Sequence, residues 1–159
     1  MLDQDVLETI AVRAMSPAAL LADLGRLIGI PNLAPSAHGS CQLVFDGCHP
    51  VTLVFVPAMR NLVISCPCGG SAAVDAKAAM MALRANFMGC GSDGGSLSLG
   101  PDGRLHLQFQ LPLGGIDAPV ILDTIERLLN RVESWQRRIA ATTRAEQTNR
   151  SLAILVQRG

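Results

Sequence analysis

Six cysteine and histidine side chains, the most reactive types in this chain, fall between positions 38 and 68. They are His38, Cys41, Cys48, His49, Cys66 and Cys68. A structural zinc site uses ligand pairs spaced as Cys-x2–4-Cys, whereas Cys66 and Cys68 have a single residue between them and Cys41 and Cys48 flank a predicted turn. Because free cysteine also behaves as a small buried hydrophobe, we interpret these cysteines as core residues and predict neither a metal ion nor another cofactor.

Nucleophilic catalysis by one of these thiols would need a histidine base and a third group that orients it. No local signature links His38, His49 or His106 to a cysteine. The glycine-rich stretch 89–95 follows a predicted helix and precedes a strand, the reverse of a phosphate-binding loop, and it lacks the Lys-Ser/Thr pair. No paired carboxylates suit acid–base catalysis. The sequence therefore predicts a protein that is not an enzyme, with a small cysteine- and histidine-based enzyme or metal protein left as an alternative.

The composition restricts the classes of protein that fit this chain. Of its 159 residues, 49% are hydrophobic and 16% charged, and the formal net charge is +0. This composition excludes a disordered tail and is typical of one domain with a substantial core. A nucleic-acid binder usually carries an excess of basic residues, and this chain has none. No apolar run reaches the roughly 18 residues of a membrane span. Because the acidic start lacks the basic region of a secretory signal, we expect a cytoplasmic protein.

A β-hairpin between residues 96 and 111 is the clearest local signal. Apolar residues alternate with polar ones on both sides of a Gly-Pro-Asp-Gly turn at 100–103. The apolar positions are Leu97, Leu99, Leu105, Leu107, Phe109 and Leu111. This alternation predicts two antiparallel strands. Each strand has one apolar face, which the rest of the chain must cover.

Helix and strand signals along the chain complete the predicted fold. The predicted helices are 16–28, 72–88 and 117–139, and the predicted strands are 40–46, 51–56, 62–66, 96–99 and 105–111. Ser16 and Asp117 are helix N-caps, and Gly29 ends the first helix. The order α-βββ-α-ββ-α predicts a single α+β domain with an antiparallel five-stranded sheet flanked by three helices.

We expect this domain to span 16–141, between an N-terminal extension, 1–15, and a C-terminal extension, 142–159. Residues 1–15 fit either a short helix or a mobile segment. The apolar segment 151–156 can dock, pair as an edge strand or stay mobile. Helices 16–28 and 72–88 carry more apolar residues than a small monomer buries easily. Each of these residues considered alone fits ordinary core packing, but the pattern of both helices together favours a homodimer.

Five stretches follow one another in an order that belongs to a known family. They are Leu-Leu-Ala-Asp-Leu-Gly-Arg-Leu-Ile-Gly-Ile-Pro at 20–31, Cys-Gln-Leu-Val-Phe-Asp-Gly at 41–47, Met-Met-Ala-Leu-Arg-Ala-Asn-Phe at 80–87, Ser-Leu-Ser-Leu-Gly-Pro-Asp-Gly-Arg-Leu-His-Leu at 96–107 and Glu-Ser-Trp at 133–135. In this the chain resembles the Tir chaperone (CesT) family, the effector chaperones of bacterial type III secretion. The resemblance implies a non-enzymatic chaperone that binds the N-terminal region of a secreted effector and keeps it soluble and secretion-competent.

The resemblance also implies partners and binding faces. The partners are a second copy, with the middle helix at or near the two-fold contact, a secreted effector and the secretion ATPase. Strand addition with side-chain pockets is a physical mode that fits such binding. The candidate effector contacts are Leu20, Leu24 and Leu27 on the first helix and Val44, Val54 and Val56 on the first strands. The candidate dimer contacts are Ala78, Met81, Ala82 and Ala85. Leu24→Asp is accordingly predicted to weaken the effector complex and leave the fold intact.

Two features depart from the family pattern. The chain is formally neutral, whereas family members are usually acidic, so an acidic surface that attracts a basic effector does not follow from its charge. It also carries extra residues at both ends. An alternative function for the same fold is a general protein-interaction or regulatory module outside secretion.

Overall fold

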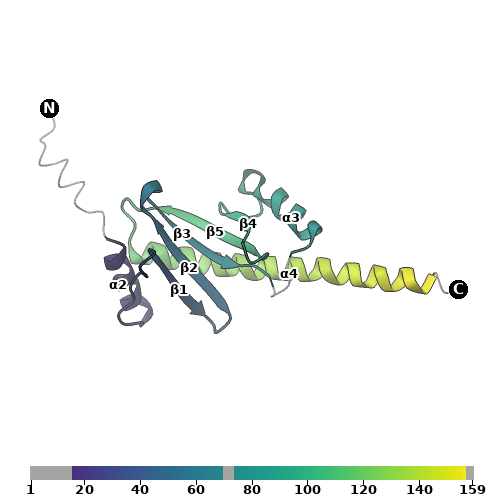
Figure 1. Ribbon diagram of the computed structural model, residues 1–159, viewed down its shortest axis with the longest axis horizontal. Coiled ribbons are helices and arrows are strands. Elements are labelled where there is room, and N and C mark those ends of the chain that lie inside the picture. The colour runs from purple at the N-terminus through teal and green to yellow at the C-terminus, as the bar shows by residue number, and fades with distance from the viewer. Residues whose placement is uncertain (1–15, 70–73, 157–159) are drawn as a thin grey trace, which may run out of the picture. The chain divides into compact units, whose positions relative to one another are not determined.

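A computed structural model describes residues 16–69 and 74–156 and has the predicted order of elements there (Figure 1). The elements are α2 (Pro17–Ile28), β1 (Ser40–Phe45), β2 (His49–Val56), the short 3-10 helix η1 (Pro57–Met59), β3 (Asn61–Pro67), α3 (Ala76–Asn86), a second 3-10 turn η2 (Phe87–Gly89), β4 (Ser96–Leu99), β5 (Leu105–Pro112) and α4 (Ala118–Val156). The predicted α+β class and element order are confirmed. The extension predicted at 1–15 lies outside the described residues.

The helix α2 has the boundaries that its sequence predicts. The Ser16 hydroxyl accepts a hydrogen bond from the Ala19 N–H at 3.2 Å. Gly29 ends the helix at φ 75°, a left-handed conformation that glycine adopts without steric cost. One side of the helix is buried, at Leu20, Leu21, Leu24 and Gly25. α2 is therefore amphipathic, with a core face and an outer face.

The strands form one antiparallel sheet in the order β1-β2-β3-β5-β4, so β1 and β4 are its edges. The register places Cys41 of β1 opposite Leu53 of β2, and Leu53 opposite Ile64 of β3. Odd-numbered residues of β2 are buried and even-numbered ones are half-buried. Because side chains alternate between the two faces of a strand, this register gives β1–β3 one core face and one outer face.

The described residues group into two compact units. The first contains residues 16–65 and 109–127, and the second contains 66–69, 74–108 and the helix from 128 onward. Fully buried side chains of the first unit include Leu20, Leu21, Leu24, Val51, Leu53, Leu62, Ile64, Ile121 and Ile125. In the second unit Trp135 is 1% exposed, and its indole N–H donates to the Gly91 carbonyl at 3.2 Å. Each unit thus has its own buried core.

The helix α3 is shorter than predicted. Asp75 caps its start by accepting a hydrogen bond from the Ala78 N–H at 2.7 Å, and the helix ends at Asn86 rather than at Met88. The reason is that Phe87 has ψ 113° and Met88 has φ 54°, and both conformations lie outside the right-handed helical region. The chain turns there through η2 and leads into the hairpin of β4 and β5.

The helix α4 is longer than predicted, at 39 residues. Its expected end near 141 is corrected, because Thr142 and Thr143 do not interrupt it. Their hydroxyls donate to the carbonyls of Arg138 and Ile139, at 3.0 and 3.2 Å, a bond that lets these residues stay helical. The segment 151–156 continues the same helix. Among residues 16–69 and 74–156, no helix combines the length and apolar character that crossing a membrane requires.

Candidate functional site

The edge strand β1 directs unused backbone groups away from the sheet. Residues of an antiparallel pair alternate between hydrogen-bonded and non-bonded positions. The Phe55 N–H donates to the Gly39 carbonyl at 2.9 Å, so the odd-numbered residues of β1 bond with β2 and the even-numbered ones point outward. Ser40 uses its outward groups in a loop, where its carbonyl accepts from the Ser36 N–H at 2.7 Å. The backbone groups of Gln42 are therefore directed at the open edge, as are those of Val44.

The opposite edge of the sheet, at β4, is covered at Leu97 by a side chain. The Gly100 N–H donates to the Arg104 carbonyl at 2.8 Å, which places the outward backbone groups on odd-numbered residues of β4. The outward N–H of Leu97 donates to the Asn86 side-chain oxygen at 2.8 Å, and its carbonyl accepts from the Asn86 amide nitrogen at 2.9 Å. The two edges thus differ, because Asn86 occupies the outward groups of Leu97 on β4 but no side chain in the described part of the chain does so at Gln42 and Val44 on β1.

The three valines predicted as effector contacts share one face of the sheet. Val44 lies opposite Pro50, and Val54 lies opposite both Ser40 and Val63. Val44 is 62% exposed, whereas Val54 and Val56 are half-buried. All three belong to the outer face, away from the buried residues of β2. The structure therefore places Val44 at the open edge of β1, whereas Val54 and Val56 lie one strand further in, beyond the polar pair Gln42 and Thr52.

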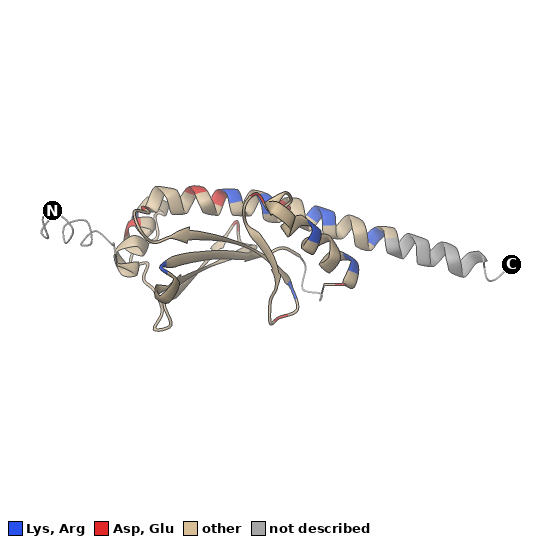
Figure 2. Cartoon of the chain, turned by 90° about the horizontal axis from the view of Figure 1, so that it is seen from above, with Lys and Arg blue, Asp and Glu red and all other residues tan. Residues whose placement is uncertain are grey.

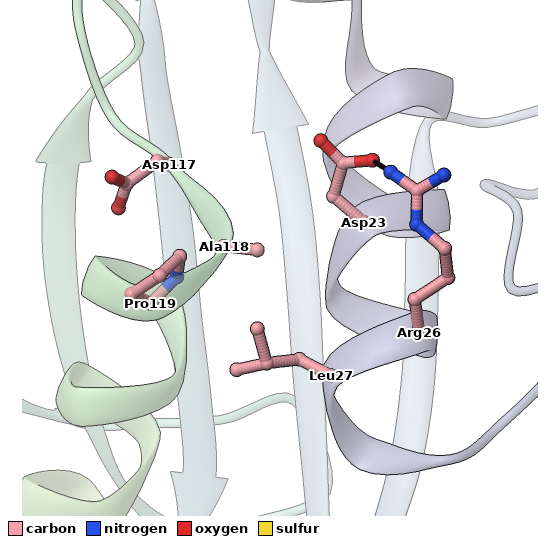
Figure 3. A pocket seen from close by; sticks show the side chains of 6 residues that line it. All are labelled: Asp23, Arg26, Leu27, Asp117, Ala118 and Pro119. Carbon is pink, nitrogen blue, oxygen red and sulfur yellow. Dashed lines mark hydrogen bonds and ion pairs between the residues drawn. The ribbon is translucent and has the colours of Figure 1, made fainter.

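A pocket of about 420 Å³ lies between α2 and the first turn of α4 (Figure 3). Its lining residues are Asp23, Arg26, Leu27, Asp117, Ala118 and Pro119. Asp23 forms an ion pair with Arg26 on the outside of α2. Asp117 caps α4 by accepting from the Val120 N–H at 3.0 Å. The pocket therefore combines apolar walls with two carboxylates and one guanidinium.

The predicted contacts on α2 divide between the core and this pocket. Leu27 is 51% exposed and lines the pocket. Leu20 and Leu24 are both 0% exposed, because they occupy the core face of the helix. This corrects the prediction that all three leucines face an effector. Leu27 alone of the three is on the surface.

The predicted dimer contacts on α3 also need correction. Ala78, Ala82 and Ala85 are 2%, 3% and 7% exposed and pack inside their own unit. The approach is close, since a Cβ added at Gly91 would lie 2.5 Å from the Ala85 Cβ. Met81 is half-buried and lines a second pocket. The small side chains thus allow another backbone segment to approach closely. That segment, at Gly91, belongs to the same chain and not to a second copy.

The exposed apolar residues of this region lie on the opposite side of α3 and in η2. They are Met80, Leu83, Phe87 and Met88, with exposures of 50%, 65%, 73% and 84%. We call these four side chains the α3 face. Sequence reasoning missed its position because the helical pattern of residues 76–88 has apolar residues all round, and only packing decides which side stays outside.

The cysteines and histidines do not converge. Burial raises the pKa of the Cys41 thiol, and burial together with the neighbouring Cys66 raises the pKa of Cys68 to about 12, so neither is a ready thiolate. The exposed Cys48 has its sulfur 3.2 Å from Nδ1 of His49. Within the part of the chain that the structure describes, no three His, Cys, Asp or Glu side chains gather in a way that could hold a metal ion.

Several residues of the site carry no sequence signal for it. Asp117 and Pro119 mark a helix start in the sequence, but nothing there shows that this start faces α2. Gln42 looks like any polar residue of an alternating strand. Asn86 reads as a late helical residue, and its role at Leu97 depends on a contact between residues 11 positions apart.

Comparisons with known proteins identify a family through its sequence model and a fold through solved structures. The model of the Tir chaperone protein (CesT) family matches residues 19–136. A search of the curated proteins finds no match. Three solved structures share the fold: the HopA1–SchA chaperone–effector complex, the ExsC–ExsE complex, and the Yersinia pestis type III secretion chaperone SycH with a stable fragment of YscM2.

The similarity to these structures lies in the fold more than in the sequence. Their TM-scores are 0.62, 0.67 and 0.61, with 21%, 23% and 15% identical residues. The matches cover 74%, 74% and 76% of this chain and 91%, 89% and 100% of the other chains, in the same order. The matched regions therefore take in nearly the whole of each neighbour.

Proposed function

The chain belongs to the Tir chaperone protein (CesT) family, and on that basis we propose that it is a non-enzymatic type III secretion chaperone of the bacterial cytoplasm. It binds the N-terminal region of a secreted effector and keeps that region soluble and ready for secretion. The observation that carries this proposal is the open edge of β1, where Gln42 and Val44 direct backbone groups away from the sheet. The secretion ATPase is the partner to which the loaded chaperone delivers the effector.

An extended effector segment fits this edge by strand addition. Main-chain hydrogen bonds to Gln42 and Val44 supply affinity whatever the amino-acid sequence of the effector segment. The side chains of the added strand set its register. Beside the edge, Val44 offers exposed apolar surface on the outer face of the sheet. An unfolded segment that pairs here covers its own apolar side chains and is kept from aggregating.

The pocket beside α2 supplies a second contact. Leu27 and Pro119 form an apolar wall, and Asp23 and Asp117 are the acidic residues of the lining (Figure 3). An effector segment with an apolar residue and a neighbouring cation complements this pocket. Two contacts on one chain raise the effective concentration of the second binding event once the first has formed, so two modest contacts suffice for a stable complex.

We also propose that the chaperone is a homodimer, with the α3 face as the contact. This face replaces the buried alanines of the original prediction. Its four apolar side chains are exposed within one short segment, whereas single exposed hydrophobic residues are common on monomers. The proposed contact is still on the middle helix, α3, but on its exposed apolar side instead of the side of the alanines.

The edge contact is tested by proline substitution. Proline at 42 or 44 removes one outward N–H and leaves the bonds of β1 with β2 in place. The probe is the N-terminal region of a secreted protein that co-purifies with the wild-type chain from its native host, co-expressed and purified with the chaperone. We expect Gln42→Pro and Val44→Pro each to weaken binding about tenfold, the value of one hydrogen bond.

The matched controls are Gln42→Ala and Val44→Thr, which keep the backbone N–H. Circular dichroism and urea unfolding show whether each variant is folded. Unchanged affinity in both proline variants would exclude strand addition at β1. Failure of any secreted protein from the native host to co-purify with the wild-type chain would count against the chaperone function itself.

A further inference from the structure

A pocket of about 480 Å³ lies between α3 and the later part of α4. Its lining residues are Ala76, Lys77, Met80, Met81, Arg84 and Thr142. Thr142 comes after residue 136, where the family match ends. One wall of the pocket is therefore built by the part of α4 that extends beyond the family region.

The turn η2, which directly follows the helix that lines this pocket, carries the most exposed apolar side chains of the α3 face. Phe87 and Met88 are 73% and 84% exposed. A two-fold axis brings the same surface of both copies together, so that residue i meets residue j and j meets i. A surface that carries both a pocket and a projecting aromatic ring is suited to such a contact.

The spacing along α3 agrees with this arrangement. In an antiparallel pair of α3 helices with the axis near Leu83, Phe87 lies four residues beyond the axis, or about 6 Å at the helical rise. It then stands opposite residue 79 of the partner, level with the lining residues 76–81 of the pocket. Met88 follows Phe87 directly and extends the contact.

The chemistry of the pocket suits an aromatic ring. Thioether sulfurs, which Met80 and Met81 provide, make favourable contacts with ring edges. Lys77 and Arg84 are cations at the pocket, and cations are attracted to ring faces. The pocket thus offers both apolar and charge complementarity to phenylalanine.

The exposed area is also a large part of what a dimer needs. At roughly 200 Å² for a fully exposed side chain of this size, the four side chains of the α3 face expose on the order of 500 Å². A standard interface covers about 800 Å² on each partner, and the walls of the pocket supply further area. A second copy of this chain is therefore the occupant that the surface fits.

We propose that Phe87 of each protomer fills the pocket between α3 and α4 of the other, so that the extended part of α4 belongs to the dimer interface. This rests on the homodimer proposed above and adds to it the anchor residue, the pocket and the role of Thr142. Phe87 is the anchor of the interface, in the sense that its truncation costs more than that of its neighbours.

The test measures the dimer dissociation constant of the full chain by sedimentation equilibrium. Phe87→Ala is expected to weaken the dimer at least tenfold, as for an interface anchor. Thr142→Trp fills the pocket and is expected to weaken the dimer to a similar degree. The double variant is expected to be no weaker than Phe87→Ala alone, because no ring is left to be excluded. Met59→Ala, at another exposed methionine (63%), is the control and leaves the constant unchanged.

The outcomes separate this inference from the homodimer. Leu83→Asp places a charge at the proposed axis and is expected to give monomers. If Leu83→Asp dissociates the dimer but Phe87→Ala and Thr142→Trp do not weaken it, the pocket assignment is overturned and the dimer through α3 stands. If the wild-type chain is a monomer at micromolar concentration, or if Leu83→Asp also leaves the dimer intact, both are overturned.

Discussion

Asn86 shows how one side chain can decide which part of a sheet is available. Its amide group bonds to both the N–H and the carbonyl of Leu97, as a neighbouring strand would. Proteins commonly protect edge strands against pairing with other chains. At β4 this protection comes from the last residue of α3, whereas β1 has no equivalent at Gln42 and Val44 among the described residues.

Replacing Asn86 by alanine is expected to open the β4 edge. The loss of two hydrogen bonds should lower the free energy of unfolding by about 1–2 kcal/mol. Hydrogen exchange of the Leu97 amide should become faster. Asn86→Asp is the matched control, because it keeps the acceptor for the Leu97 N–H and loses the donor to its carbonyl. Unchanged protection of the Leu97 amide in the alanine variant would contradict the role given to Asn86.

Asp102 organises the turn between β4 and β5. Its carboxylate accepts hydrogen bonds from Arg104 Nε at 2.7 Å, from the Arg104 N–H at 3.1 Å and from His106 Nε2 at 3.2 Å. The bonds from Arg104, with a smaller contribution from His106, hold the pKa of Asp102 well below its usual range. A carboxyl with a folded pKa below its unfolded value, about 3.9, adds stability above that pH and loses it as the pH falls through the folded pKa.

Carboxyl ¹³C NMR should therefore show Asp102 still ionised below pH 3.9 in the wild-type protein. Arg104→Gln removes the Nε donor and the charge, and is expected to move the titration midpoint upward. Arg104→Lys keeps the charge without the Nε donor and should give an intermediate midpoint. A midpoint near 3.9 in all three proteins would contradict the assigned cause.

The helix α2 has one buried face and one exposed face. Leu24 is fully buried and Leu27 is half exposed, although both were predicted to contact the effector. Leu24→Asp places a charge in the core, so we expect it to lower the free energy of unfolding by roughly 3 kcal/mol or more. The earlier expectation that this change leaves the fold intact is withdrawn on that ground.

Leu27→Asp is the substitution that tests effector binding on α2. We expect it to change stability by no more than about 0.5 kcal/mol and to weaken effector binding. Urea unfolding of both variants, together with co-purification of the effector, measures the two effects separately. Equal destabilisation by Leu24→Asp and Leu27→Asp would contradict the two-face description of α2.

Charge is distributed unevenly along α4. Asp123 and Glu126 come first, and arginines predominate from Arg127 onward, with Glu133 among them (Figure 2). The formal net charge of +0 therefore conceals a segregation that the total does not reveal. The acidic pocket beside α2 and the basic pocket beside α3 lie in different units.

The proposed homodimer predicts that stability depends on protein concentration. Because dimer formation stabilises the folded chain by mass action, a tenfold increase in concentration should raise the melting temperature of the wild-type protein by about 2 °C. Leu83→Asp should abolish this dependence and lower the melting temperature. Differential scanning calorimetry over a hundredfold range of concentration measures both. A melting temperature that does not change with concentration in the wild type would contradict the homodimer.

The sequence alone determined the class of fold, the order of its elements and the family. Those features depend on local patterns, such as the Ser16 cap, the alternation from residue 96 to 111 and the Asp117 cap, and short-range chemistry sets them. It also indicated that apolar surface is in excess, because a count of apolar residues needs no coordinates.

Only the tertiary structure decided which faces those elements bury. On α3 the alanines pack inward and Met80, Leu83 and Phe87 stay outside, because Gly91 allows a close approach on the alanine side. On α2 the core takes Leu20 and Leu24 and leaves Leu27. The difference between the two sheet edges likewise rests on Asn86 reaching Leu97. These outcomes depend on contacts between residues distant in the chain. The spacing of apolar residues in a helix or strand does not say which distant element packs against each face.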